Sequence, residues 1–258
     1  MRKLWRQWGR VSQKLEEAPH RLFLFDFDGT LAPIAPTPRQ AHLPPQTRTL
    51  LRRLSERRHS TVGIVSGRSL PDLRRRVRLP ELLYVGNHGF EFEAARRRWV
   101  HPEAKRRVRS LLSLAGALSK TLSSIPGAWI ENKGFTLSVH FRQVLPRRRS
   151  AVGRLVRQTL AHPGGRTRWD LRRGKMTLEI RPAVEWNKGS VLALLRKRCP
   201  KNTELLYVGD DFTDEDAFRV VGRDGIAVRI GARKRSPAPY YLGRQKEVQR
   251  LLEKLVTL

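Results

Sequence analysis

Two aspartates follow directly on an apolar run near the start of the chain. Residues Leu22 to Phe25 are all apolar, and Asp26 and Asp28 come next with a single phenylalanine between them. Residues two apart in an extended segment point the same way, so both carboxylates can enter one crevice at the end of a strand. Two like charges held together there require a cation, and hard oxygen ligands favour magnesium. This spacing predicts a metal-assisted reaction at the carboxyl end of a buried strand.

Asp28-Gly29 has a second interpretation, because an Asp-Gly pair is also a strong hairpin signal. The residues that follow argue against a hairpin. Pro33, Pro36 and Pro38 lack the amide hydrogens that a return strand would need. The chemical interpretation is therefore favoured, and it depends on partners further along the chain.

Those partners also follow predicted buried segments or begin predicted helices: Ser66, Lys188, Asp210, Asp211 and Asp214. In a doubly wound sheet such ends meet at one crevice. Phosphoryl transfer uses a set of this kind, with a hydroxyl and an ammonium to hold the migrating group and further carboxylates for the metal. Asp26 can accept the phosphoryl group covalently, and Asp28 can then exchange protons with the leaving oxygen and with water.

As a set, these residues resemble the four motifs of the haloacid dehalogenase-like phosphatases: Asp26-Phe27-Asp28-Gly29-Thr30, Ser66-Gly67-Arg68, Lys188, and Gly209-Asp210-Asp211-Phe212-Thr213-Asp214-Glu215. The resemblance implies that Asp26 is the nucleophile, that Asp28 is the general acid and base, and that Ser66 and Lys188 hold the phosphoryl oxygens. It also implies Mg²⁺ bound by Asp26, the backbone carbonyl of Asp28 and Asp210. Asp211 or Asp214 would contact the metal directly or lie behind its ligands.

The sequence further resembles the trehalose-6-phosphate phosphatases. The resemblance is carried by Gly86-Asn87-His88-Gly89, Glu131-Asn132-Lys133-Gly134, His140-Phe141-Arg142, Gly174-Lys175 with Glu179, and the tail from Ala238 to Val248. It implies that Glu131, Lys133 and Glu179 grip the sugar from an inserted cap. The remaining candidate substrate contacts are Gly67, Arg68, Asn87, His88 and Arg142. Glu131 and Lys133 can also be explained as a surface pair, and His88 and His140 as structural residues.

The elements that must position these residues alternate between apolar runs and helical patterns. This alternation predicts an α/β fold with a Rossmann-like parallel-sheet core. From about residue 95 the pattern changes to that of antiparallel strands with helices, which predicts an inserted α/β cap domain. We expect a first core segment over 1–94, with a basic helix in residues 1–20, the cap over 95–183, and a second core segment over 184–258.

The charge of the chain is strongly positive. Its 258 residues carry 53 Lys and Arg against 23 Asp and Glu, a formal net charge of +30. Such a charge attracts phosphate compounds, nucleic acid or anionic lipid. The arginines form short clusters without interleaved aromatic residues, which favours solvated helix faces over a nucleic-acid tract. Nucleic-acid binding is thus disfavoured but stays open.

The chain has one cysteine, Cys199, which excludes an intrachain disulfide and a thiolate-rich metal site. No apolar run approaches the length of a membrane span. We therefore expect a cytoplasmic protein. The resemblance to the trehalose-6-phosphate phosphatases implies in addition that it hydrolyses trehalose 6-phosphate with Mg²⁺, and we expect it to be a monomer. The alternatives are a phosphatase of sucrose phosphate or of a glycosyl-glycerate phosphate, and a polyanion-binding protein that uses the basic surface.

Overall fold

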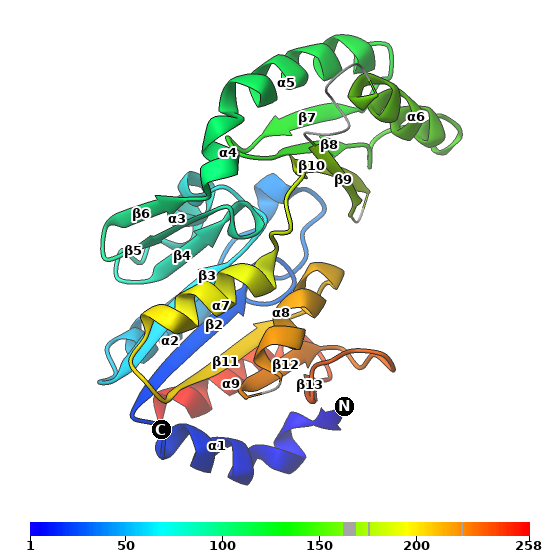
Figure 1. Ribbon diagram of the computed structural model, residues 1–258. Helices are drawn as coiled ribbons and strands as arrows, with labels where there is room; N and C mark the ends of the chain where they lie inside the picture. Colours follow the sequence, from blue (N-terminus) through cyan, green and yellow to red (C-terminus); the bar gives the residue numbers. More distant parts are fainter. Residues whose placement is uncertain (162–168, 175, 223) are drawn as a thin grey trace. The chain divides into compact units, whose positions relative to one another are not determined.

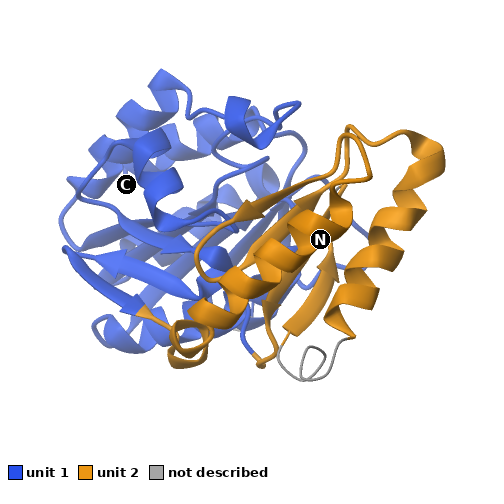
Figure 2. Ribbon diagram, turned by 90° about the horizontal axis from the view of Figure 1, so that it is seen from above, with its two compact units in different colours: residues 1–99, 186–258 blue, residues 100–185 orange. Residues whose placement is uncertain are grey.

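The computed structural model describes residues 1–161, 169–174, 176–222 and 224–258 (Figure 1). These divide into two compact units, unit 1 with Met1–Trp99 and Trp186–Leu258, and unit 2 with Val100–Glu185 (Figure 2). The predicted boundaries of the cap domain, residues 95 and 183, remain predictions. Lys175, which belongs to one predicted substrate motif, lies outside the described residues.

Unit 1 is built on a sheet in which the order of strands is β1-β13-β12-β11-β2-β3-β4-β5-β6. Every pairing from β1 to β4 is parallel, and β5 pairs with β4 in the antiparallel direction. The strands are β1 (Arg2–Lys3), β2 (His20–Asp26), β3 (Ser60–Val65), β4 (Leu83–Gly86), β5 (Glu91–Ala94), β6 (Arg97–Val100), β11 (Thr203–Gly209), β12 (Ile226–Ile230) and β13 (Tyr240–Leu242). The predicted parallel core is confirmed.

Helices cover both faces of this sheet, because its central strands are apolar on both sides. Phe23 and Phe25 of β2 pack with one set of helices, whereas Leu22 and Leu24 pack with the other. The first set is α1 (Trp8–Glu16), α2 (Pro45–Ser55), α3 (Leu70–Val77) and α9 (Glu247–Val256), and the second is α7 (Lys188–Arg198) and α8 (Glu215–Val221). Four short 3-10 turns, η1 (Leu4–Gln7), η2 (Pro38–Gln40), η3 (Asn87–Gly89) and η5 (Phe212–Asp214), join these elements in the described part of unit 1.

The basic N-terminal segment is docked on unit 1. Leu4, Val11 and Leu15 are buried in the core, and the indole Nε1 of Trp5 donates a hydrogen bond to Glu247 at 2.5 Å. The apolar side of the predicted helix thus faces the protein. Across the described ranges, no helix is both long and apolar enough to cross a bilayer.

Unit 2 is a four-stranded antiparallel sheet with helices packed on one face. The strand order is β7-β8-β10-β9, and Leu137, Val139 and Ile180 face a core shared with α5 and α6. The elements are α4 (Pro102–Arg106), α5 (Val108–Leu122), β7 (Trp129–Asn132), β8 (Leu137–His140), the 3-10 turn η4 (Pro146–Arg148), α6 (Arg149–Leu160), β9 (Trp169–Arg173) and β10 (Thr177–Pro182). The predicted α/β insert is therefore an antiparallel sheet backed by helices, as the pattern of apolar residues indicated.

Candidate active site

Asp26, the last residue of β2, lies beside Lys188, the first residue of α7. The Lys188 Nζ donates to Asp26 Oδ1 at 2.6 Å and to Asp214 Oδ1 at 2.7 Å. Lys188 reaches this position because Asn187 caps α7, its side chain accepting a hydrogen bond from the amide of Ser190. Burial lowers the pKa of Lys188, but Asp214 and Asp26 outweigh this effect and raise it, so the ammonium stays charged.

Asp214 is the fully buried centre of this group. Its carboxylate accepts hydrogen bonds from Lys188, from the Tyr207 hydroxyl at 2.6 Å, and from the amides of Asp210 at 3.0 Å and Asp211 at 2.8 Å. A carboxylate offers about four lone-pair sites, and these four bonds occupy them. Asp214 is therefore suited to hold the loop after β11 and to orient Lys188, rather than to bind a metal directly.

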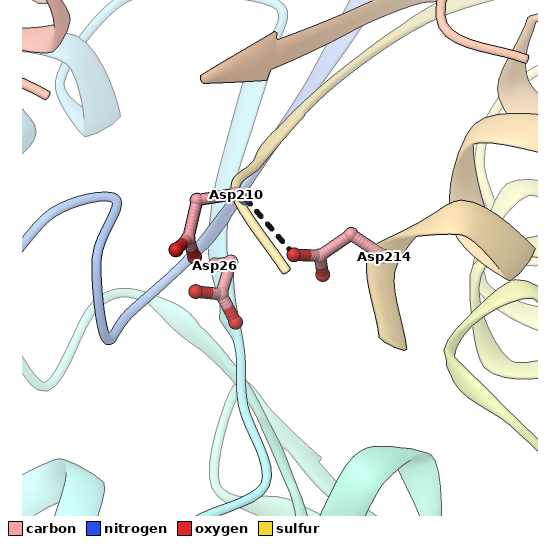
Figure 3. A group of neighbouring side chains, drawn as sticks. All are labelled: Asp26, Asp210 and Asp214. Atoms are coloured by element: carbon pink, nitrogen blue, oxygen red, sulfur yellow. Dashed lines mark hydrogen bonds between the residues drawn. The ribbon is translucent and has the colours of Figure 1, made fainter. Parts of the chain in front are cut away.

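Asp210 completes a cluster of carboxylates at the ends of β2 and β11 (Figure 3). One oxygen from each of Asp26, Asp210 and Asp214 lies within 4.8 Å of the others. Burial raises the pKa of Asp26, Lys188 opposes this effect, and Asp214 and Asp210 raise the pKa further. A cation bound between Asp26 and Asp210 would offset this repulsion, so the donor set fits a divalent metal ion.

Gly29 makes room for this arrangement. Its φ is +89°, and a Cβ there would lie 2.4 Å from Asp210 Oδ2. Any other residue would require a strained backbone and a displaced carboxylate. The glycine of the first motif therefore keeps Asp210 close to the loop that carries Asp28.

Asp28 is held by a buried arginine. Arg68 donates from Nε to Asp28 Oδ2 at 2.7 Å and from one terminal nitrogen to Oδ1 at 2.6 Å. The same guanidinium donates to Asp72 at 2.7 Å and to the Pro38 carbonyl at 2.9 Å. A two-pronged contact of this kind fixes the orientation of a carboxylate. The guanidinium of Arg68, predicted as a substrate contact, is thus committed to Asp28 and to the start of α3.

Ser66 and Gly67 follow β3 and lie against the turn after β4. The Ser66 hydroxyl accepts a hydrogen bond from the amide of Arg68 at 3.2 Å, and the Ser66 carbonyl accepts one from the amide of His88 at 2.9 Å. A Cβ on Gly67 would lie 2.3 Å from the His88 ring. The Asn87 side chain is buried and donates to Glu91 at 2.6 Å. These residues are brought together, while their contact with substrate stays a prediction.

The sequence profile of the trehalose-phosphatase family matches residues 24–245 of this chain, which contain all four motifs described above. The chain belongs to the trehalose-phosphatase family. The expected resemblance is confirmed.

Curated relatives in the trehalose-phosphatase family support the match. Trehalose-phosphate phosphatase B of Arabidopsis thaliana is 33% identical over 252 residues, which cover 91% of this chain and 66% of that protein. Trehalose-phosphate phosphatase of Mycobacterium marinum is 35% identical over 217 residues, covering 82% of this chain and 54% of that protein. The chain thus spans between about half and two thirds of the length of these relatives.

Solved structures of similar proteins share the fold. The C-terminal domain of Candida albicans trehalose-6-phosphate phosphatase superposes with a TM-score of 0.80 at 23% identity, covering 97% of this chain and 96% of that chain. A trehalose-6-phosphate phosphatase of Aspergillus fumigatus gives a TM-score of 0.65 at 27% identity, covering 96% and 97%. A haloacid dehalogenase-like hydrolase of Bacteroides thetaiotaomicron, at 15% identity, gives 0.64 and covers 92% and 99%. The predicted haloacid dehalogenase-like fold is confirmed.

The residues that the family resemblance assigned to the sugar lie together on unit 2. Glu131 and Glu179 both pair in register with Ser138 across β7, β8 and β10, on the sheet face opposite the apolar core. The Ser138 hydroxyl donates to Glu179 at 2.7 Å, and the Lys133 Nζ lies 3.4 Å from the same carboxylate.

His140 holds the side chain of Glu131 in position on the same face of the sheet. Its Nε2 lies 2.9 Å from Glu131 Oε2, and its ring stacks on Trp129 at 3.9 Å between centroids. Burial raises the pKa of Glu131, but the bond to His140 and the charge of Lys133 lower it overall, so this carboxylate is ionised at neutral pH. Arg142, also predicted to contact substrate, follows β8 and is exposed.

Two residues of the core site were missed from the sequence. Tyr207 appeared to be one more apolar residue of a buried strand, and its hydroxyl hydrogen bond to Asp214 has no signal in the sequence. Asp72 lies four residues after Arg68, but Arg68 precedes α3, so the spacing rule for one helix face gave no signal for this pair.

Proposed function

We propose that this chain is a magnesium-dependent phosphatase that hydrolyses trehalose 6-phosphate to trehalose and phosphate. The observation that carries the proposal is the cluster at the ends of β2 and β11, where Asp26, Lys188, Asp210 and Asp214 meet in a member of the trehalose-phosphatase family. An anion-handling reaction needs a nucleophile, a fixed cation and further carboxylates at one point, and this cluster supplies them.

Asp26 acts as the nucleophile. Lys188 engages its Oδ1, and Oδ2 accepts no hydrogen bond from the described residues. In the first step Oδ2 forms a bond to phosphorus as the bond between phosphorus and the sugar oxygen breaks, giving an aspartyl-phosphate. Asp28, protonated at the start of this step, gives its proton to the departing sugar oxygen; trehalose leaves and Asp28 becomes a carboxylate.

In the second step Asp28 takes a proton from water, and the water oxygen attacks the phosphorus of the aspartyl-phosphate. The bond between phosphorus and Asp26 Oδ2 breaks, which releases phosphate and restores both carboxyl groups. Asp28 can serve both steps because its side chain is 42% exposed and Arg68 fixes its orientation. We assign Arg68 to this positioning, since its guanidinium is already shared between two carboxylates.

Lys188 neutralises the phosphoryl oxygens during both steps, and the Ser66 hydroxyl helps to hold them. Lys188 is charged and preorganised by Asp214, so it needs no rearrangement to meet the developing negative charge. Mg²⁺ would be held by Asp26, Asp210 and the Asp28 carbonyl, where it would neutralise phosphoryl oxygens. Asp214 and Asp211 support that site from behind.

We also propose that unit 2 is the cap that selects the sugar. Glu131 and Glu179 are carboxylates on one sheet face, and paired sugar hydroxyls donate well to carboxylates. Lys133, beside Glu179, supplies a cation for the phosphate. Asn87, His88, Gly67 and Arg142 stay candidates for further contacts with the substrate.

The test is phosphate release from a panel of trehalose 6-phosphate, sucrose phosphate, a glycosyl-glycerate phosphate and p-nitrophenyl phosphate, each with Mg²⁺ and with EDTA. We expect metal-dependent release that is fastest with trehalose 6-phosphate. Asp26→Asn keeps the shape of the side chain, and it should lower kcat by about 10³-fold or more because the nucleophile is lost. Release that survives EDTA, or near-normal turnover by Asp26→Asn, would contradict the mechanism.

The sugar-binding role of unit 2 is tested separately. Glu131→Gln should lower kcat/KM for trehalose 6-phosphate by about 10- to 100-fold, the loss expected from one hydrogen bond to a carboxylate, and leave p-nitrophenyl phosphate nearly unaffected. Asp170→Asn, on β9 at the opposite edge of the same sheet, is the matched control and should change neither rate. If Glu131→Gln slowed both substrates equally, unit 2 would not act through the sugar.

A further inference from the structure

A hollow of about 490 Å³ opens in unit 1 at the amino ends of the central strands. Its wall includes His20 and Leu83, the first residues of β2 and β4, and Thr61 near the start of β3. Asp26 ends the seven-residue strand that His20 begins. At about 3.3 Å per residue the two ends lie roughly 20 Å apart, so this amino-end hollow is separate from the phosphatase site.

The interior of the amino-end hollow is apolar. Leu22, Phe92 and Leu195 belong to the core cluster under α7, and each presents part of its side chain to the hollow. Trp99 stacks on Phe92 at 5.0 Å between ring centroids, which gives one side a flat aromatic wall. Ligand pockets of drug size have about this volume and this kind of lining.

The rim of the hollow is positively charged. Arg97, Arg98 and Arg198 line it, and no carboxylate is among its lining residues in the described part of the chain. Arg98 is paired with Glu91 at 2.6 Å, and the Arg198 guanidinium lies 5.0 Å from the centre of the Phe92 ring. Arg97 and Arg198 are both exposed. An occupant thus meets aromatic and aliphatic surface inside and guanidinium groups at the mouth.

We propose that the amino-end hollow binds a small amphipathic anion, with an aromatic or short alkyl body and a carboxylate, sulfonate or phosphate head. The body replaces water on the apolar wall, and the head pairs with Arg97 and Arg198, because guanidinium groups match the geometry of these anions. A sugar phosphate lacks the apolar body, so this ligand differs in class from the proposed substrate.

Cys199 offers a direct report on occupancy, because it lines the hollow and is the only cysteine among the 258 residues. It is partly exposed, and burial raises the pKa of its thiol. Alkylation is therefore measured at mildly alkaline pH, where enough thiolate is present. A ligand in the hollow covers the sulfur and slows the reaction.

The experiment uses the full chain and 8-anilinonaphthalene-1-sulfonate as the probe, followed by its fluorescence and by the rate at which iodoacetamide alkylates Cys199. We expect saturable binding of one probe per chain and slower alkylation over the same concentration range. Arg198→Gln should weaken binding of the anionic probe about fivefold, the factor expected from one exposed charge pair, and leave binding of uncharged N-phenyl-1-naphthylamine unchanged. Arg53→Gln, an exposed arginine on α2, is the matched control.

Three results would overturn the proposal. The probe binds elsewhere if it gives fluorescence without slowing the alkylation of Cys199. If Arg198→Gln and Arg53→Gln change the affinity for the anionic probe equally, the arginines at the rim do not bind its head group. The third result would show that a second copy of the chain, and not a small anion, covers the hollow. In that case Cys199 is protected from alkylation without probe and sedimentation shows a dimer. Ala94→Trp, which fills the hollow, then dissociates this dimer.

Discussion

Replacing Asp72 by asparagine tests whether the negative charge of Asp72 holds Arg68, the arginine that orients Asp28. Asp72 is 14% exposed and accepts hydrogen bonds from Arg68 at 2.7 Å, Arg76 at 2.8 Å and Arg75 at 3.0 Å. Burial raises the pKa of Asp72, but the bonds from Arg76 and Arg68 outweigh it and lower the pKa to about 2. The ionised carboxyl group therefore stabilises the fold.

The size of this effect follows from the pKa. A change from 3.8 to about 2 corresponds to at most about 2.5 kcal/mol, at 1.36 kcal/mol for each pH unit. Water reaches part of the group and screens it, so we expect about 1 to 2 kcal/mol. Because the folded-state pKa of Asp72 is the lower one, this stability is present above about pH 4. It is lost as the pH falls toward 2.

The assay is urea denaturation of the parent chain and of Asp72→Asn, followed by tryptophan fluorescence at pH 7, pH 5 and pH 3. The free energy of unfolding should differ by the same 1 to 2 kcal/mol at the two higher values and by less at pH 3. Asp224→Asn is the control, because Asp224 is 72% exposed and lies 3.8 Å from its partner Arg196. A difference that persists undiminished at pH 3, or that Asp224→Asn reproduces, would refute the reasoning.

Three further predictions concern the carboxylate cluster. Gly29→Ala should raise the Mg²⁺ concentration needed for half-maximal phosphate release at least tenfold, because the new methyl group displaces Asp210; the measurement is a Mg²⁺ titration of the rate. Lys188→Met should lower kcat by about 10² to 10³-fold, the usual loss for one preorganised charge donor, measured with saturating substrate. Tyr207→Phe should destabilise the fold by about 1.5 to 3 kcal/mol in urea denaturation, because Asp214 loses a buried hydrogen bond.

Much of unit 1 could be predicted because its strands are local features of the sequence. The apolar run before Asp26 predicts a strand buried on both faces, as does the run before Asp210, and the structure has a strand at both places. The strands β1 and β13 were missed, since they have two and three residues and exist only through their pairing with each other and with β12. No periodic pattern can appear in so few residues.

The site could be predicted as a set of residue types but not as a network. The order of motifs brought Asp26, Lys188 and Asp210 into one group. It gave no sign that both carboxylate oxygens of Asp214 would be taken up by hydrogen bonds from the protein. Nor did it show that Arg68 would bind Asp28. Such details depend on side-chain directions that only the packed structure determines.

Part of the arginine excess also has a structural explanation. Arg48 donates to the carbonyls of Val77 and Arg76, which end α3, and Arg149 donates to the carbonyls of Val144 and Arg142. In a chain with few acidic residues, guanidinium groups satisfy main-chain oxygens that loops leave exposed. These arginines need no polyanion to account for them.

The bond between Lys188 and Asp26 joins residues 162 positions apart, on opposite sides of unit 2 in the chain. The same separation applies to the strands. β2 pairs with β3 on one edge and with β11 on the other, so during synthesis the second edge stays open until β11 has been made. Translation proceeds at about 5 to 20 residues per second, so the second edge of β2 waits on the order of ten seconds for its partner. Throughout that time an apolar strand has unpaired amides and carbonyls. Chains that stop before Thr203 never lose this open edge, and we expect such fragments to aggregate while the finished protein stays folded.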